Sequence, residues 1–344
     1  MTLPVKPPVE PMLAKLEKEV PRGEGWRYEP KWDGFRAIVF RDGDRIRLGS
    51  RGGKELHRYF PELVDALAKG LPDRYVMDGE IVVAWDGVLD FEVLQQRVHP
   101  AESRVRRLAK ETPSSFVAFD LLAEGGSDLR KRPLAERWDR LSTLIPRKTT
   151  SATMRAILAP RTKVVLTPQT TRPNEAIRWF EELEPSGLDG VIAKREDLTY
   201  QPGKRAMVKV KHQRTLEAVV GGYRVHKSGK GVGSLLLGLY DSEGNLRHIG
   251  ASGAFSVSDR LAIQEKLRPL EGGESFALDT MLGGPSRWRA HEREWIPLKP
   301  ELVCEVAYDH FQGERLRHLG QFIRWRPDRD PRDCTLEQAL PGRG

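Results

Sequence analysis

Lys31-Trp32-Asp33-Gly34-Phe35-Arg36 stands immediately before a stretch that predicts a β-hairpin. Residues 36–40 and 45–48 have strand composition, and Asp42-Gly43 between them is a strong turn signal. The spacing Lys-x-Asp-Gly-x-Arg arises by chance in roughly one chain in a hundred of this length. Taken alone, the hexapeptide fits a catalytic lysine and a surface turn, in which Asp-Gly reverses the chain, equally well.

The chain up to residue 213 mixes helical and strand patterns, which indicates an α+β domain. Pro61 opens a short helix that Gly70 closes, and Asn174 is expected to cap another. Two more helices are expected at residues 91–98 and 135–144. Strands are expected at residues 75–83, 116–122, 164–167, 190–194 and 206–211.

From residue 214 onward, short strands separated by glycine turns dominate the pattern. One helix is expected among them, at residues 257–267. Five strands with one helix fit a small β-barrel of the oligonucleotide-binding (OB) type, and a β-sandwich gives a similar count. The sequence therefore predicts two domains, residues 1–213 and 214–344. The five strands are expected at residues 217–223, 234–241, 246–250, 302–308 and 321–325.

The composition is that of an ordinary water-soluble chain: 39% of the 344 residues are hydrophobic and 31% are charged. No apolar run is long enough to span a bilayer and the first ten residues do not look like a leader, so we expect a cytoplasmic protein. Cys304 and Cys334 are the only cysteines, too few for a disulfide framework or a four-thiolate zinc site. The net charge of +8 favours a polyanion such as nucleic acid.

Further short patterns follow the hexapeptide in a fixed order, and the set resembles the covalent nucleotidyltransferases. The resemblance is closest to the small bacterial ATP-dependent DNA ligases, whose module also forms the ligase domain of multifunctional end-joining enzymes. It extends from about Glu29 to Arg329. The patterns are Ser50-Arg51-Gly52, Asp78-Gly79-Glu80, Phe116-Val117-Ala118-Phe119-Asp120, Asp189-Gly190-Val191-Ile192-Ala193-Lys194, Lys209-Val210-Lys211 and Arg326-Pro327-Asp328-Arg329.

This resemblance implies an adenylation (nucleotidyltransferase) domain with antiparallel sheets and flanking helices, followed by an OB barrel. It also implies that Lys31 is the nucleophile that becomes linked to AMP. Glu29 would contact the adenine amino group, and Glu80 the ribose hydroxyl and a metal. Arg51 would meet the phosphate or sugar of the nicked strand, and it is also counted among the ATP-binding residues. Arg36 belongs to the same ATP-binding set.

The resemblance assigns the remaining residues to the purine, the phosphates and the metal. Phe119 would stack on the purine, although its apolar neighbours suit a buried strand nearly as well. The α-phosphate would be held by Lys194, Lys209 and Lys211, the pyrophosphate oriented by Arg326, Asp328 and Arg329, and the metal held by Glu80 and Asp189. Two residues depart from the family pattern: Asp189 replaces a Glu and Arg329 replaces a Lys, which changes their reach and geometry.

An ordinary lysine has a pKa of about 10.4, so Lys31 must lose a proton before it can attack ATP. If Lys194, Lys209 and Lys211 converge on Lys31 together with a bound Mg²⁺, we expect like-charge repulsion to lower the pKa of Lys31, and burial to add to this. Mg²⁺, or Mn²⁺ in its place, needs only one or two carboxylates plus phosphate oxygens and water. We also hypothesise that the barrel domain swings about residues 211–215 between reaction steps.

Three other functions share parts of this pattern. RNA ligases and capping guanylyltransferases also use a Lys-x-Asp-Gly core, and labelling with ATP but not GTP would separate the capping enzymes. A noncatalytic nucleic-acid-binding scaffold would explain the charge but has no need for the carboxylates Asp33 and Glu80. The preferred prediction is an ATP-dependent DNA ligase of DNA repair, a monomer that acts on nicked duplex DNA, with a DNA end-binding repair protein as a candidate partner.

Overall fold

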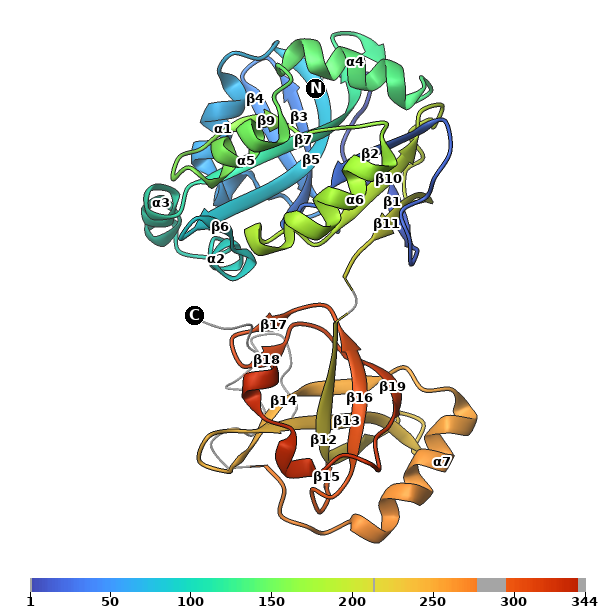
Figure 1. Cartoon of the computed structure of the whole chain (residues 1–344). Helices are drawn as coiled ribbons and strands as arrows, with labels where there is room; N and C mark the ends of the chain where they lie inside the picture. Colours follow the sequence, from blue (N-terminus) through green and yellow to red (C-terminus); the bar gives the residue numbers. More distant parts are fainter. Residues whose placement is uncertain (1, 213, 277–294, 340–344) are drawn as a thin grey trace. The chain divides into compact units, whose positions relative to one another are not determined.

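The structure is a computed structural model that describes residues 2–212, 214–276 and 295–339. Its contacts divide the chain into two compact units, Met1–His212 and Gln213–Gly344. Both appear in Figure 1, the first in blue to yellow-green and the second in yellow to red. The expected division after residue 213 is one residue away from this boundary, and residue 213 itself lies outside the described residues.

The larger sheet of the first unit contains the predicted hairpin. Its strand order is β4-β3-β5-β7-β8, with β6 paired to β5 and β9 paired to β7. All pairs are antiparallel except β7 with β9. The hairpin is confirmed, with Gly43-Asp44 as its two-residue loop because Asp42 still pairs with Arg45. The strands are β3 Phe35–Asp42, β4 Arg45–Ser50, β5 Arg74–Trp85, β6 Val88–Leu89, β7 Ser114–Glu124, β8 Ser127–Asp128 and β9 Val164–Leu166.

A second, four-stranded sheet has the order β1-β11-β10-β2 and was only half expected. Strands β10 Val191–Arg195 and β11 Arg205–Val210 were predicted. Strands β1 Leu13–Leu16 and β2 Trp26–Pro30 were not, because β1 is only four residues long and pairs in parallel with the distant β11. Residues 31–34 connect β2 of this sheet to β3 of the larger one, so the hexapeptide lies where the two sheets meet (Figure 1).

Helices pack against the sheets of the first unit. The four predicted helices are present, but α6 begins at Pro173, and Asn174 is therefore inside the helix rather than its cap. Helices α3 and α5 were missed: in α3 only Val105 and Leu108 are buried, so its apolar stripe is very short. The helices are α1 Pro61–Ala68, α2 Phe91–Gln96, α3 Glu102–Glu111, α4 Leu134–Leu144, α5 Thr150–Leu158 and α6 Pro173–Glu182.

The second unit is a curved sheet of the order β14-β13-β12-β16-β19, with β15 paired to β12. A bridge between Ser252 and Gly320 joins the ends of its two edge strands, so the sheet closes on itself as a barrel does and a sandwich does not. The five main strands and helix α7 Val257–Leu267 were all predicted. The strands are β12 Arg214–Val225, β13 Val232–Tyr240, β14 Leu246–Gly253, β15 Ile296–Pro297, β16 Val303–Tyr308, β17 Phe311–Gln312, β18 Arg315–Leu316 and β19 Gln321–Trp325.

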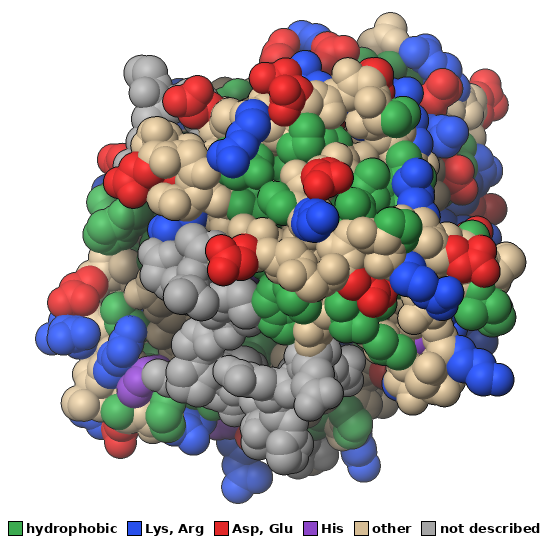
Figure 2. All heavy atoms as spheres, turned by 90° about the horizontal axis from the view of Figure 1, so that it is seen from below, with side chains coloured by type: hydrophobic (Ala, Val, Ile, Leu, Met, Phe, Trp, Pro, Cys, Tyr) green, Lys and Arg blue, Asp and Glu red, His purple; other side chains and the backbone are tan. Residues whose placement is uncertain are grey.

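The surface charge is mixed. Figure 2 shows one face of the molecule, on which Lys and Arg side chains alternate with Asp and Glu. On that face the net charge of +8 does not form one continuous basic patch. Among residues 2–212, 214–276 and 295–339, no helix combines the length and the apolar character needed to cross a membrane.

Gly34 allows the close approach of two strands. A Cβ at this position would lie 2.2 Å from the Ile81 carbonyl oxygen, which belongs to the rigid strand β5. We predict that Gly34→Ala lowers the free energy of unfolding by about 1–3 kcal/mol, because the backbone must shift to admit the methyl group. Gly126→Ala is the control, since a Cβ there meets nothing within 4 Å. Equal stability of both variants, measured by thermal unfolding, would contradict the close packing at Gly34.

Candidate active site

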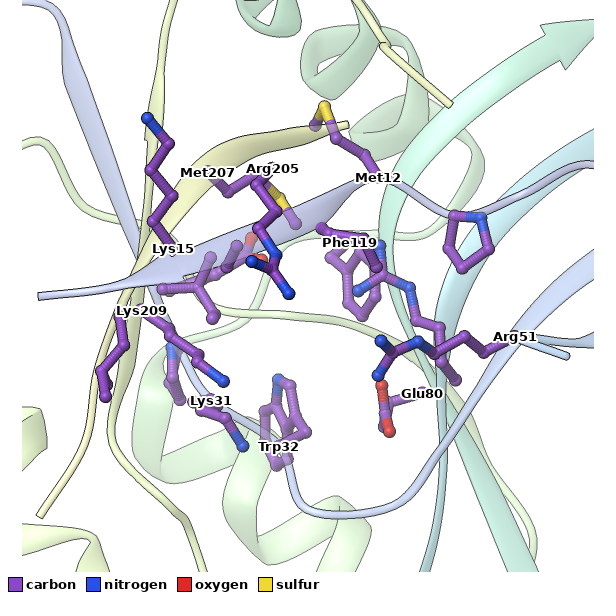
Figure 3. A pocket seen from close by; sticks show the side chains of 18 residues that line it. Met12, Lys15, Lys31, Trp32, Arg51, Glu80, Phe119, Arg205, Met207 and Lys209 are labelled. Atoms are coloured by element: carbon purple, nitrogen blue, oxygen red, sulfur yellow. The ribbon is translucent and has the colours of Figure 1, made fainter. Parts of the chain in front are cut away.

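A cavity of about 500 Å³ lies against Lys31 and is lined by residues from both sheets. This volume is in the range of sites for small molecules and cofactors. In Figure 3, Lys31 and Lys209 lie on one side of the cavity and Arg51 and Glu80 on the other, with Trp32 between them. Of the predicted site residues, the cavity is lined by Glu29, Lys31, Arg36, Arg51, Glu80, Phe119 and Lys209.

Lys31 is held in place by its backbone and by an ion pair. Its N–H donates to the Gly190 carbonyl at 2.8 Å, and its own carbonyl accepts from the Asp189 N–H at 3.1 Å. Its ammonium forms an ion pair with the Asp189 carboxylate, and its side chain is only 19% exposed. Trp32 next to it is buried and donates from Nε1 to Thr167 Oγ1 at 2.9 Å. The hexapeptide is therefore not a surface turn.

The charges around Lys31 differ from those expected from the sequence. Burial acts to lower the pKa of Lys31, but Asp189, Asp33 and Glu80 together outweigh it, and the net pKa is raised. Burial therefore acts on this pKa in the expected direction, but the expected lowering by neighbouring lysines is not among the main effects on Lys31. Carboxylates, which stabilise the ammonium, are the groups that act on it most strongly.

Lys194 and Glu29 form a buried ion pair beside the cavity. The Lys194 ammonium lies 2.6 Å from Glu29 Oε1, and Gln169 Nε2 donates to Glu29 Oε2 at 3.0 Å. Burial raises the pKa of Glu29, and the charge of Lys194 opposes this shift. Lys194 is 2% exposed and, like Lys211 and Asp189, is not among the residues that line the cavity. The structure therefore places Lys194 against a carboxylate rather than at the cavity wall.

Phe119 is both a buried core residue and part of the cavity wall, so it fits both roles considered from the sequence. Its side chain is 4% exposed and packs in the domain interior, yet it lines the cavity. The Arg36 guanidinium lies 4.3 Å from the centre of its ring, and the Lys194 ammonium lies 4.7 Å from it. Arg36 is in turn held by Asp78, with Nε and Nη2 at 2.6 and 2.7 Å from the two carboxylate oxygens.

Glu80 is the most perturbed carboxyl group of the cavity. Burial raises its pKa to about 8, and the nearby charges of Asp33 and Asp78 add to this shift. Arg36 and Lys31 oppose it. A carboxyl group that is costly to ionise in this way gains from a cation placed next to it.

The donor set suits Mg²⁺ better than a metal that needs a complete protein cage. Within the described ranges, no group of three or more His, Cys, Asp or Glu side chains is arranged to hold a metal. Asp189 pairs with the Lys31 ammonium, and Glu80 lines the same cavity as Lys31. Two carboxylates are what Mg²⁺ takes from a protein when phosphate oxygens and water complete its shell.

The second unit brings together the residues predicted to orient pyrophosphate. Arg326 donates from Nε to Asp328 at 3.0 Å and pairs with Glu217. Arg329 Nε lies 2.7 Å from Glu217. The hydrogen bonds from Arg326 lower the pKa of Asp328 to about 2. Arg326, Asp328 and Arg329 therefore form one cluster with Glu217, which was not predicted.

Comparison with known families gives a match along most of the chain. The sequence profile of the ATP dependent DNA ligase domain matches residues 11–211. That of the ATP dependent DNA ligase C terminal region matches residues 228–329.

The chain belongs to the ATP-dependent DNA ligases. This membership confirms the expected enzyme class and ATP as the nucleotide of that class.

Individual ligases resemble the chain over nearly its whole length. DNA ligase C2 of Mycolicibacterium smegmatis is 52% identical and covers 98% of this chain and 96% of its own. DNA ligase C of Mycobacterium tuberculosis is 49% identical, with coverages of 98% and 95%. The multifunctional non-homologous end joining protein LigD of Mycobacterium bovis is 34% identical over 91% of this chain, which matches 37% of LigD.

A solved Lig E DNA ligase structure shares the fold. It covers 92% of this chain and 99% of its own, with a TM-score of 0.57 and 18% identity. At this level of identity the likeness concerns the fold alone.

The cavity of this ligase also contains residues that were not predicted. Arg205 and Met207 line it beside Lys209. Because side chains alternate along a strand, residues two and four positions before Lys209 share its face, and this period could have identified Arg205. The contribution of residues 11–16 could not be found in this way, because it depends on β1 pairing with β11.

The raised pKa of Glu80 makes stability depend on pH. Its ordinary pKa of 4.5 applies to the unfolded chain and about 8 to the folded one. Between these values the folded state retains a proton that the unfolded state has lost, so stability falls as the pH rises. We predict that wild type loses thermal stability relative to Glu80→Gln between pH 4.5 and 8, in metal-free buffer. The exposed Glu92→Gln is the control, and parallel curves for wild type and Glu80→Gln would contradict the prediction.

Proposed function

We propose that this ligase seals nicks in duplex DNA through an AMP group carried on Lys31. The observation that supports this most directly is the placement of Lys31: its backbone is fixed by hydrogen bonds to Asp189 and Gly190, and its amine pairs with Asp189 beside a cavity between two sheets. The cavity presents an aromatic ring, carboxylates and cations, which are the groups that a nucleoside triphosphate needs.

Three steps would use this cavity. The unprotonated Lys31 Nζ attacks the α-phosphorus of ATP, a P–N bond forms, and pyrophosphate leaves. The 5′-phosphate at the nick then attacks the same phosphorus, so that AMP moves from Lys31 to DNA. Finally the 3′-hydroxyl attacks the activated 5′-phosphate, and AMP leaves as the phosphodiester forms.

Within the cavity, each wall would bind a different part of ATP. Glu29 accepts a hydrogen bond from the adenine amino group, and Phe119 stacks on the purine. Arg36 and Arg51 contact the ribose and phosphates, and Lys209 lies at the α-phosphate. Lys194 supports Glu29 from behind the cavity wall and Lys211 extends the same basic edge. In the second unit, Arg326, Asp328 and Arg329 orient the pyrophosphate.

The carboxylates link metal binding to activation of Lys31. Glu80 and Asp189 would hold Mg²⁺, which neutralises charge on the phosphates when bound. Asp189 contributes most among the charges that raise the pKa of Lys31. Once Asp189 and Glu80 are engaged elsewhere, they no longer favour the ammonium, and burial then lowers the pKa of Lys31. The acids therefore keep Lys31 protonated until the substrate and metal are in place.

A role in DNA repair follows from the relatives. LigD is named for non-homologous end joining, and this chain matches about a third of its length. We propose that the chain acts as a monomeric nick-sealing module at DNA breaks and is recruited by a DNA end-binding protein. A binding assay with duplex ends and purified end-binding protein would test recruitment.

We predict that Lys31→Ala abolishes covalent labelling by α-³²P-ATP, because the Lys31 amine is the group that would form the P–N bond with AMP and its backbone is fixed at the cavity. Lys69→Ala is the matched control, since Lys69 is exposed at the end of α1. Labelling is read by gel and the adduct is placed by mass spectrometry.

The same assay separates the alternative functions. A wild-type chain that labels with GTP instead of ATP would be a capping-type enzyme. One that labels with ATP but joins only RNA strands would be an RNA ligase. Undiminished labelling of Lys31→Ala would place the nucleophile elsewhere and reject the proposed mechanism.

We predict that Glu80→Gln and Asp189→Asn raise the Mg²⁺ concentration needed for half-maximal adenylylation by about tenfold or more, because each removes a charged ligand. The rate of labelling would be measured against Mg²⁺ concentration at saturating ATP. Glu92→Gln should leave the Mg²⁺ dependence unchanged. An unchanged dependence in both Glu80→Gln and Asp189→Asn would exclude them as metal ligands.

A further inference from the structure

A buried phenol connects two parts of the cavity wall. Tyr200 precedes β11 and is 5% exposed. Its hydroxyl donates to Asp78 Oδ2 at 2.6 Å and accepts from the Met12 N–H at 3.2 Å. One oxygen atom therefore joins the rim of residues 11–16 to the carboxylate that holds Arg36. Tyr200 is not among the residues that line the cavity, so it acts only through these neighbours.

The bond to Asp78 matters because this carboxylate is completely buried. Asp78 Oδ1 accepts from Arg36 Nε at 2.6 Å, and Oδ2 accepts from both Arg36 Nη2 and the Tyr200 hydroxyl. A buried carboxylate that loses a donor keeps its desolvation cost, and it rotates or draws in water to recover a hydrogen bond. Either response moves the planar guanidinium that is paired with it.

Movement of Arg36 would change the shape and charge of the cavity wall directly. Its guanidinium lies 4.3 Å from the centre of the Phe119 ring, and both residues line the wall. Met12, the other partner of the Tyr200 hydroxyl, is buried and belongs to the rim of residues 11–16. Burial, with the charge of Asp78 in addition, holds the pKa of Tyr200 well above its usual range, so the hydroxyl remains a donor.

We propose that Tyr200 is a positioning residue for ATP: its hydroxyl fixes Arg36 on the face of Phe119 and holds the Met12 rim, and it thereby sets the affinity for the nucleoside. This inference rests on the proposed function of the cavity as the ATP site. It concerns binding rather than the chemistry at Lys31, because the Tyr200 hydroxyl bonds to Met12 and Asp78 rather than to Lys31 or to the carboxylates proposed to hold the metal.

The test is Tyr200→Phe, with Tyr75→Phe as a matched control. Tyr75 is also fully buried, and its hydroxyl donates to the Leu67 carbonyl at 3.0 Å. Each variant therefore loses one buried phenol oxygen, but Tyr75 is not among the residues that line the cavity. The rate of enzyme–AMP formation is measured against ATP concentration, and thermal unfolding is measured for each variant.

We expect Tyr200→Phe to raise KM for ATP about tenfold and to change kcat by less than about twofold, since a buried hydrogen bond to a charged group is lost. Tyr75→Phe should keep the wild-type KM even if it unfolds at a similarly reduced temperature. A KM within about twofold of wild type in Tyr200→Phe, or an equal rise in both variants, overturns the proposal.

A double-mutant cycle tests whether the effect passes through Arg36. If it does, Arg36→Lys and Tyr200→Phe together should raise KM by less than the product of their separate effects. A fully multiplicative effect would overturn the proposed route. Should Tyr200→Phe fail to fold, Asp78→Asn replaces it, because it retains the side-chain volume but removes the charged acceptor. An unchanged KM in a folded Asp78→Asn variant also overturns the proposal.

Failure of this inference can be told apart from failure of the proposed function. If the wild-type chain forms no enzyme–AMP, the cavity is not an adenylylation site and both ideas are rejected. If the wild type forms enzyme–AMP and Arg36→Lys raises KM while Tyr200→Phe does not, only the role of Tyr200 is rejected.

Discussion

The crossing of residues 31–34 from one sheet to the other is the constraint on which the rest of the site depends. The backbone of Lys31 is tied to Asp189 and Gly190 on the smaller sheet. Three residues later, Gly34 passes so close to the Ile81 carbonyl that no side chain fits. The backbone is thus fixed at both ends of this short crossing. The position of the Lys31 side chain is restricted further by its ion pair with Asp189. The cavity forms beside this crossing because its walls come from both sheets.

Ion pairs that are buried or partly buried then give the site its rigidity and its electrostatic character. Three charged pairs lie around the cavity: Lys31 with Asp189, Lys194 with Glu29, and Arg36 with Asp78. Removing one member of such a pair leaves a buried charge without compensation, so each pair resists rearrangement. A substrate that carries phosphates and a cation can exchange partners with these groups at little cost. Ion pairs of this kind therefore suit a site whose side chains are ordered before ATP binds and can change partners when it binds.

Local patterns predicted most of the fold and several residues that line the cavity. The hairpin after Lys31, the helices opened by Pro61 and Pro173, and the five long strands of the barrel follow from turn residues and periodicity. Strands β1 and β2 and helices α3 and α5 were missed, since elements of four to ten residues leave little pattern. The family motifs named several residues that line the cavity, among them Lys31 and Glu80, and Arg205 was missed because it lies outside those motifs.

The sequence by itself determined the family, the order of the elements and the identity of the candidate nucleophile, because these depend on residue types and their spacing along the chain. Only the tertiary structure decided which charges meet. It placed carboxylates rather than lysines around the Lys31 amine, Lys194 against Glu29, and Tyr200 between Met12 and Asp78. Electrostatic and hydrogen-bond energies depend on distances of a few ångströms, and residues as far apart as Met12 and Tyr200 acquire such distances only when the sheets have formed.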